Sequence, residues 1–276
     1  MQKDDIINKY NDEEDKLLAA RILDKIKLAK TRNQIEYTDF LNMHQKVISQ
    51  EILKMQKEEN YTFFTPCEGA EKPVLVVYPN KYAELFEQNK YNYSNIAEVI
   101  RIKLPKENKE KYIHKDYLSG IMKLGIKREK IGDIFVFEDG ADVVVSKEIS
   151  KYLVERIGQL TRFSKAQIEK LDISEIRKPD IKKEIMDIRV SSLRLDNMVA
   201  ELAHCSRTKA NEIIEAQRVF LNYINEENNS KIVKQGDIIV IRGKGKFNVL
   251  KIDGQTKKRK NNSNGGTLYI KGENYG

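Results

Sequence analysis

The sequence contains no tryptophan, only two cysteines and only five prolines in 276 residues. Cys67 and Cys205 lie far apart, and no Cys or His pair stands near either at the spacing of zinc ligands. These thiols therefore exclude a disulfide framework and a structural zinc site. His204 precedes Cys205, but neighbouring residues of a helix point in different directions, so we expect a partly buried helical pair and no metal site. We expect no cofactor.

Long apolar runs are also missing. No stretch reaches the roughly 18 apolar residues of a membrane-spanning helix, and the first five residues, Met-Gln-Lys-Asp-Asp, contain no signal-peptide core. With 40% hydrophobic and 33% charged residues, the chain can bury cores beneath a polar surface. We therefore expect a soluble, cytoplasmic protein of two or three small domains, with no membrane partner.

The positive charge is unevenly distributed along the chain. The net charge is +8, yet residues 190–276 hold 15 Lys and Arg against 9 Asp and Glu. Residues 242–260 alone contain eight basic residues and one acidic residue, Asp253. A basic end on a nearly neutral body is typical of proteins that bind a polyanion. A solvated tail would have the same composition, so charge alone leaves both interpretations open.

The first 175 residues divide into two regions of different pattern. Residues 1–60 are expected to be helical, because Leu18, Ile22 and Ile26 recur at helical spacing. Residues 61–175 mix strand and helix signals, and Asp139-Gly140 predicts a two-residue hairpin turn. This mixture indicates an α+β domain. Its expected strands are 74–78, 96–104, 134–137 and 142–145, and its expected helices are 115–124 and 147–157.

A charged stretch with Pro179, residues 176–189, is expected to be a linker into the last domain, residues 190–276. Apolar spacing predicts two short helices at its start, followed by a small sheet. The expected helices are 193–203 and 207–216, and the expected strands are 219–221, 238–241, 247–252 and 268–270.

Cations stand where these two helices are expected to begin. Ser192 and Ser206 can cap them, and Arg194, Arg207 and Lys209 follow in the first turns. A cation there faces the positive end of the helix dipole, which is unfavourable in free energy unless an anion binds. Free N–H groups, dipole and side-chain charge would then converge on a phosphate. Neutralisation by a local carboxylate is the alternative, with Asp196 as the obvious partner.

A second basic element follows the strand at 238–241. Residues 242–247 read Arg-Gly-Lys-Gly-Lys-Phe, so Arg242, Lys244 and Lys246 alternate with glycines. Glycines let a backbone approach a ligand closely, and the three cations suit phosphates. The stretch is not a nucleotide-binding P-loop, because no Gly-Lys-Ser/Thr or helix follows. A third basic run at 257–260 is either a further contact or a solvated turn.

The motifs in residues 192–242 resemble the S4 RNA-binding domain. They comprise Arg-Leu-Asp at 194–196, Ser-Arg-Thr-Lys-Ala at 206–210, Gly-Asp at 236–237 and Val-Ile-Arg at 240–242. More narrowly, the whole chain is similar to the bacterial YlmH family. That similarity rests on residues 38–41 (Thr-Asp-Phe-Leu), 68–71 (Glu-Gly-Ala-Glu), 124–133, 190–196 and 242–247.

The resemblance implies a helical N-terminal segment, a central RRM-like or ferredoxin-like RNA-binding domain and a C-terminal S4 domain of the αL type. It also implies a monomer that binds ribosomal RNA on the large ribosomal subunit, with tRNA as a further partner, in the rescue of subunits obstructed by peptidyl-tRNA. By motif matching, Arg194, Ser206, Arg207 and Lys209 would contact RNA. Arg242, Lys244 and Lys246 are our extension of this set, made from charge and position.

Two features qualify the resemblance. S4 domains commonly have glycine after the second helix, where this chain has Gln217, and a left-handed conformation there is sterically disfavoured. In the central segment, Lys127, Arg128 and Lys130 follow an expected helix. Either a second RNA contact or a solvated connection would account for them.

An RNA-modifying enzyme is the main alternative function. Pseudouridine synthases also contain Arg-Leu-Asp with a catalytic Asp, and many carry an S4 domain. Here Asp196 leads into Asn-Met-Val-Ala and the Ser-Arg-Thr helix, as in S4 domains, and His44 and His114 stand without a nucleophile partner. Residues 1–189 also lack the signature elements of a tyrosyl-tRNA synthetase. The sequence therefore predicts a binding protein and no enzyme. A protein-interaction scaffold is compatible with that function.

Overall fold

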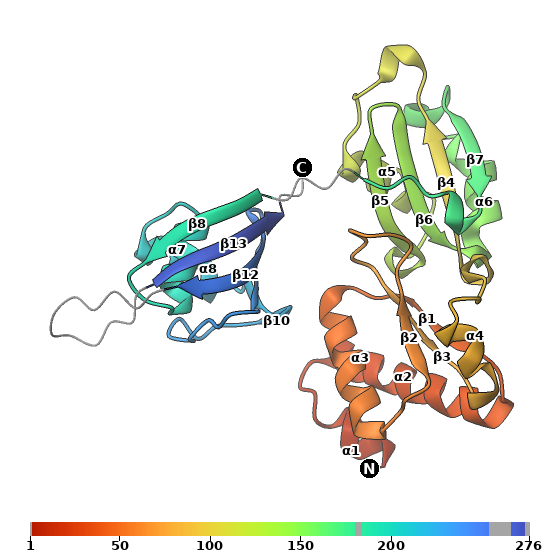
Figure 1. Cartoon of the computed structure of the whole chain (residues 1–276). Coiled ribbons are helices and arrows are strands. Elements are labelled where there is room, and N and C mark those ends of the chain that lie inside the picture. The colour runs from red at the N-terminus through yellow and green to blue at the C-terminus, as the bar shows by residue number, and fades with distance from the viewer. Residues whose placement is uncertain (1, 180–183, 254–265, 274–276) are drawn as a thin grey trace, which may run out of the picture. The chain divides into compact units, whose positions relative to one another are not determined.

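The computed structural model describes residues 2–179, 184–253 and 266–273 (Figure 1). The chain forms two compact units, Met1–Pro179 and Asp180–Gly276. Helices and strands alternate in both units, so the expected α+β class is confirmed. None of the helices in the described ranges combines the length and the apolar character that crossing a bilayer requires.

The first unit begins with a helical layer on a small sheet. Asp12 caps the longest helix by accepting from the N–H groups of Glu14 and Asp15, and Asn33 ends it in a left-handed conformation. The sheet has the order β1-β3-β2. Its elements are α1 (Lys3–Ile7), α2 (Glu13–Arg32), β1 (Glu36–Phe40), α3 (Met43–Gln56), β2 (Tyr61–Phe64), β3 (Val74–Val77) and α4 (Ala83–Glu87).

Strand β1 lies within residues 1–60, where no strand was expected. It pairs with β3, more than thirty residues further along the chain. Tertiary pairing of this kind overrides local propensity, and a single short segment gives little periodicity to detect. The boundary expected at residue 60 therefore falls inside one layer, because β2 and β3 complete the sheet that β1 begins.

The second layer of this unit is a four-stranded antiparallel sheet of order β5-β6-β4-β7. Its chain order is β4 (Ala97–Lys103), α5 (His114–Met122), β5 (Ile131–Phe137), β6 (Gly140–Ser146), α6 (Lys147–Ile157) and β7 (Gln167–Leu171). This is the split βαβ arrangement of the ferredoxin-like fold, which confirms the expected fold of the central domain.

The β5–β6 hairpin differs by one residue from the expected turn. Phe137 pairs with Gly140, so the two loop residues are Glu138 and Asp139, and Gly140 already belongs to β6. Gly140 has a φ of 142°, and a Cβ there would overlap the carbonyl oxygen of Ile102 on β4. The glycine is therefore required for close packing of two strands and not for the turn itself.

The two faces of the central sheet are covered by different parts of the chain. Helices α5 and α6 cover one face, where Ile100 and Val143 pack with Leu153 in one buried cluster. Val99 and Val144, on the other face, share a cluster with residues of the N-terminal layer such as Phe40. This shared core makes a single unit of the two layers.

The C-terminal unit packs two helices on a six-stranded sheet of order β10-β9-β11-β12-β13-β8. Strand β8 lies largely within the expected linker and pairs with β13, so both ends of the unit contribute to one sheet edge. The S4 arrangement of two helices and a small antiparallel sheet is confirmed. The elements are β8 (Glu184–Val190), α7 (Leu195–Leu202), α8 (Arg207–Glu215), β9 (Val219–Leu221), β10 (Ile224–Asn225), β11 (Ile238–Ile241), β12 (Gly245–Asp253) and β13 (Gly266–Glu273).

Candidate nucleic-acid interface

A buried carboxylate joins the starts of α7 and α8. The Asp196 side chain is only 2% exposed and accepts hydrogen bonds from two arginines. Nε and Nη2 of Arg194 lie 3.2 and 2.8 Å from its two oxygens, and Nε and Nη2 of Arg207 lie 3.1 and 2.8 Å from Oδ2. Arg194, the N-cap residue of α7, and Arg207, the first residue of α8, are thus brought to one point.

Both guanidinium groups remain accessible to a ligand. The side chain of Arg194 is 33% exposed and that of Arg207 is 54% exposed. Burial by itself would raise the pKa of Asp196, but the hydrogen bonds from Arg194 and Arg207 hold it below its usual value. The expected alternative, neutralisation by a local carboxylate, is therefore confirmed, although one carboxylate serves two cations and the pair keeps a net positive charge.

The start of α7 differs from the expected phosphate cradle. Carbonyl oxygens of the segment before β11 accept from its first N–H groups, at 2.8 Å from Leu195 N to Lys231 O and 3.1 Å from Asp196 N to Asn229 O. Ser192 accepts from the N–H of Arg194 in a local turn and is not the helix cap, so that expectation was wrong. The N–H groups of Leu195 and Asp196 are not free for an anion.

The start of α8 agrees with the expectation. Ser206 is the N-cap, and its hydroxyl accepts from the N–H of Lys209 at 3.2 Å. The ammonium of Lys209 pairs with Glu212 at 2.6 Å, and both side chains are more than half exposed. Such a surface pair contributes little stability and exchanges readily for another anion.

The basic hairpin lies toward the other end of α8. Arg242, Gly243 and Lys244 connect β11 to β12, and the N–H of Arg242 donates to the carbonyl of Arg218, three residues beyond the last residue of α8. The guanidinium of Arg242 stacks 4.8 Å from the ring centroid of Phe220. Since a nine-residue helix is about 13 Å long, the hairpin and Arg207 lie at opposite ends of α8.

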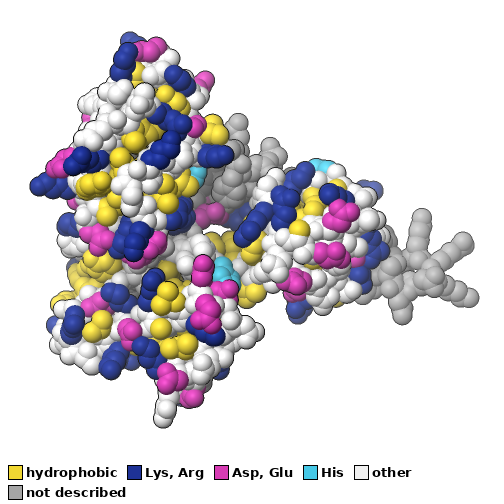
Figure 2. All heavy atoms as spheres, turned by 180° about the vertical axis from the view of Figure 1, so that it is seen from behind, with side chains coloured by type: hydrophobic (Ala, Val, Ile, Leu, Met, Phe, Trp, Pro, Cys, Tyr) yellow, Lys and Arg dark blue, Asp and Glu magenta, His cyan; other side chains and the backbone are white. Residues whose placement is uncertain are grey.

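The remaining expected cations of this unit are placed as follows. Lys244 is exposed in the hairpin, and Lys246 lies on β12 opposite Val240. Arg218, which the sequence reasoning missed, donates from Nη2 to the carbonyl of Arg242 and so belongs to the hairpin group. The basic run at 257–260 lies outside the described residues. Figure 2 shows basic side chains close together on this unit.

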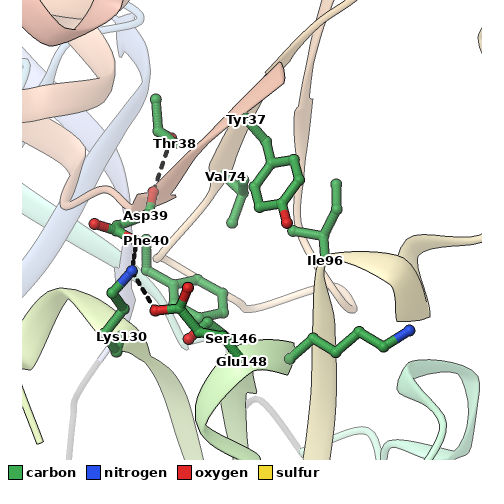
Figure 3. Close-up of a pocket in the computed structure, with 10 residues that line it drawn as sticks. Tyr37, Thr38, Asp39, Phe40, Val74, Ile96, Lys130, Ser146 and Glu148 are labelled. Carbon is green, nitrogen blue, oxygen red and sulfur yellow. Dashed lines mark hydrogen bonds and ion pairs between the residues drawn. The ribbon is translucent and has the colours of Figure 1, made fainter. Parts of the chain in front are cut away.

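In the central domain, Lys130 holds the two layers of the first unit together. Its ammonium lies 2.6 Å from Asp39 on β1 and 2.5 Å from Glu148 on α6, beside a small pocket lined by Phe40 and Ser146 (Figure 3). Burial lowers the pKa of Lys130, and the two carboxylates raise it above its usual value overall. Lys130 is therefore a structural cation, whereas its neighbour Lys127 is exposed.

The sheet face that stacks bases in RRM domains is filled here by the chain itself. After β7 the chain crosses the sheet toward β5 (Figure 1). There Arg177 pairs with Asp139 at 2.6 Å and with the fully buried Asp142 at 2.8 Å, and its guanidinium lies 4.1 Å from the ring centroid of Phe137. Arg101 pairs with Asp142 from the opposite strand at 2.8 Å. RRM-type base stacking would require Arg177 to leave this site.

Two family models match the chain. The model described as "Putative RNA-binding domain in YlmH" covers residues 92–175, and the S4 domain covers residues 193–239. A Bacillus subtilis protein named "Ribosome-associated protein quality control protein P2" is 29% identical over 239 residues, which span 85% of this chain and 88% of that protein. The solved structure of the cell division protein YlmH from Streptococcus pneumoniae is 17% identical with a TM-score of 0.46, covering 61% of this chain and 98% of that one. The chain therefore carries a segment that matches the YlmH RNA-binding domain, followed by an S4 domain, and it is similar to a YlmH-type protein over most of its length.

Proposed function

We propose that this protein binds structured RNA of the large ribosomal subunit without catalysing a reaction, and that it acts in the quality control of obstructed subunits. One observation carries the proposal: Arg194 and Arg207, at the starts of two helices, converge on the buried Asp196 while both arginine side chains stay partly exposed. The ribosome-associated quality control protein of Bacillus subtilis, which matches over most of its length, supports the ribosomal context.

The arrangement suits RNA backbone because Asp196 orients each arginine and leaves some of its N–H donors available. A guanidinium has five N–H donors, and the bonds to Asp196 engage Nε and Nη2 of each. Donors on the remaining edge can reach phosphate oxygens with the planar geometry that arginine favours. Asp196 thus fixes both side chains in advance, which lowers the entropy lost on binding.

The same carboxylate weakens the enzymatic alternative. In a pseudouridine synthase the aspartate of the Arg-Leu-Asp motif must reach the target uridine. Here both oxygens of Asp196 accept hydrogen bonds from arginines, one oxygen also accepts from the N–H of Asn197 at 2.8 Å, and the side chain is 2% exposed. Its geometry is that of a positioning residue for Arg194 and Arg207.

Ser206 and Lys209 lie at the start of α8 beside Arg207, and we include them in the same contact. We assign Arg242, Lys244 and Lys246 to a separate contact at the far end of α8. We further propose that the protein acts as a cytoplasmic monomer and contacts tRNA on the same subunit. Crosslinking of bound RNA, read by sequencing, would identify both RNA elements.

Co-sedimentation with purified bacterial large ribosomal subunits tests the main site. The double variant Arg194→Gln/Arg207→Gln should lose at least tenfold in affinity. Arg194→Lys/Arg207→Lys keeps the positive charge but lacks the planar guanidinium that can bind a phosphate through two N–H groups. Its affinity should therefore lie between those of the wild type and the Gln variant. Circular dichroism checks that all variants are folded. Unchanged sedimentation of a folded Gln double variant would overturn the site.

A further inference from the structure

The loop between β2 and β3 is fixed to the central sheet by one carboxylate. Asp133 on β5 accepts from the backbone N–H groups of Glu71 and Lys72, both at 3.1 Å. Lys72 belongs to the N-terminal layer, so these bonds bring its side chain to the edge of the ferredoxin-like domain. Residues 68–71 and 124–133, two motifs noted in the sequence, therefore meet at one place.

Arg128 lies on the central-domain side of this contact. It begins the short 3-10 helix Arg128–Lys130, and its Nη1 donates to the carbonyl of Ile131 at 2.6 Å. Like Lys72, Arg128 is partly buried. In the described part of the chain, neither the Lys72 ammonium nor the Arg128 guanidinium forms an ion pair with a carboxylate.

Lys72 and Arg128 both lie beside Asp133, because Asp133 accepts from the Lys72 N–H and the Arg128 side chain donates to Ile131, two residues before Asp133. The pKa of Lys72 is lowered to about 8. Burial and the positive charge of Arg128 lower this pKa, and the negative charge of Asp133 raises it in part. Burial also lowers the pKa of Arg128, again opposed by Asp133. The pKa of His114, at the start of α5, is lowered by burial, by Arg128 and by Lys72. The three groups form one cluster with Asp133 and Glu71 as its acidic neighbours.

Two other partly buried cations of this unit are neutralised by carboxylates. Lys130 lies between Asp39 and Glu148, and Arg177 binds Asp139 and Asp142. A buried charge is costly unless it is paired. Asp133 is a poor partner for two cations, since its oxygens accept from two backbone N–H groups and burial raises its own pKa. The cluster of Lys72, Arg128 and His114 is therefore incomplete as an ionic site.

We propose that Lys72, Arg128 and His114 form a second RNA site that binds a backbone phosphate at the junction of the two layers. The proposal rests on the proposed function, since RNA is the ligand in both. Two of the three residues lie within the segment that matches the YlmH RNA-binding domain. Because Arg177 and the N-terminal layer cover the base-stacking face, a phosphate contact at the sheet edge does not require that face to open.

Affinity for purified large ribosomal subunits, measured at several salt concentrations, tests the site. Lys72→Gln/Arg128→Gln should bind about five- to twentyfold more weakly, with a salt slope smaller by about one, as expected for loss of a phosphate contact. The matched control is Lys151→Gln/Lys165→Gln, which removes two exposed charges from α6 and the segment after it and should bind like wild type. Lys72→Gln alone provides a second variant, since it leaves the Arg128–Ile131 bond intact.

The outcomes separate this site from the S4 site. If the folded Lys72 and Arg128 variants bind like wild type while Arg194→Gln/Arg207→Gln loses affinity, the second site is overturned and the proposed function stands. If neither set of variants changes affinity, both proposals are overturned.

The pH dependence gives an independent readout. A bound phosphate would stabilise the protonated form of Lys72. Affinity should therefore fall several-fold between about pH 7 and 8.5, as Lys72 of the unbound protein loses its proton. The positive charges of Arg128 and His114 favour loss of the Lys72 proton, and the negative charges of Asp133 and Glu71 oppose it. Lys72→Arg should flatten the profile, because arginine stays charged. An identical profile for Lys72→Arg and wild type would contradict the assignment.

Discussion

Asp196 shows how one buried side chain can set the geometry of a binding surface. Its carboxylate orients Arg194 and Arg207 and is itself shielded from solvent. Replacing it with asparagine places an amide N–H₂ against two guanidinium groups and leaves donors unsatisfied. Asp196→Asn should therefore destabilise the C-terminal unit by about 1–3 kcal/mol. The same substitution should also weaken ribosome binding. Hydrogen exchange in α7 and α8 measures the first effect and co-sedimentation the second.

A surface pair nearby supplies the control for this variant. Glu212 binds Lys209, and both side chains are more than half exposed. Glu212→Gln should change stability by less than about 0.5 kcal/mol, as is usual for exposed ion pairs. Equal effects of the Asp196 and Glu212 substitutions would show that burial of the carboxylate is not what orients the arginines.

Asp142 makes the first unit sensitive to acid. Burial would raise its pKa, but hydrogen bonds from Arg101 and Arg177 lower it below the usual value. A carboxyl whose pKa is lower in the folded state stabilises the fold above its unfolded pKa, near 4, and this stabilisation is lost as pH falls through the folded pKa. Urea unfolding should show stability falling below about pH 4. Asp142→Asn should be less stable at neutral pH and lose part of that acid dependence.

Gln217 occupies a position that favours glycine. It has a φ of 56° directly after the C-cap of α8, as the comparison with S4 domains suggested. Its amide donates to Glu227 at 2.7 Å, which offsets part of the backbone strain. Gln217→Gly should stabilise the C-terminal unit by about 0.5–1 kcal/mol, measured by thermal unfolding. A clear loss of stability would mean that the Glu227 contact outweighs the strain.

At the scale of the element, strand packing explains the glycine that the sequence assigned to a turn. A Cβ at position 140 would overlap the Ile102 carbonyl, so Gly140→Ala must separate β6 from β4 or break their pairing. We expect a loss of more than about 3 kcal/mol in thermal unfolding. Gly158→Ala is the control, because a Cβ there meets no atom within 4 Å. Similar melting temperatures for the two variants would contradict this account.

The helices and most strands of the central and C-terminal domains could be predicted, because their apolar spacing is local. Strands β1 and β7 were not predicted, since each is fixed by a partner distant in sequence. The same limit applies to the site. Sequence placed cations at the helix starts, but only the fold shows that Arg194 and Arg207 share Asp196 and that Lys231 and Asn229 occupy the first N–H groups of α7.

At the scale of the whole molecule, we propose one RNA contact on each unit, at the helix starts of the S4 domain and at the sheet edge of the central domain. The first unit uses Lys130 and Arg177 for its own cohesion. An RNA contact of this unit would therefore use other cations, and we propose Lys72 and Arg128. A protein with two such surfaces can engage two stretches of RNA backbone on one particle.

The salt dependence of binding to purified large ribosomal subunits tests the central claim most directly. If about five to eight phosphates are contacted, the logarithm of affinity should fall against the logarithm of salt concentration with a slope of several units. Arg194→Gln/Arg207→Gln should reduce that slope by about two. An affinity that does not change with salt, or a double variant with the wild-type slope, would contradict recognition of RNA backbone by these arginines.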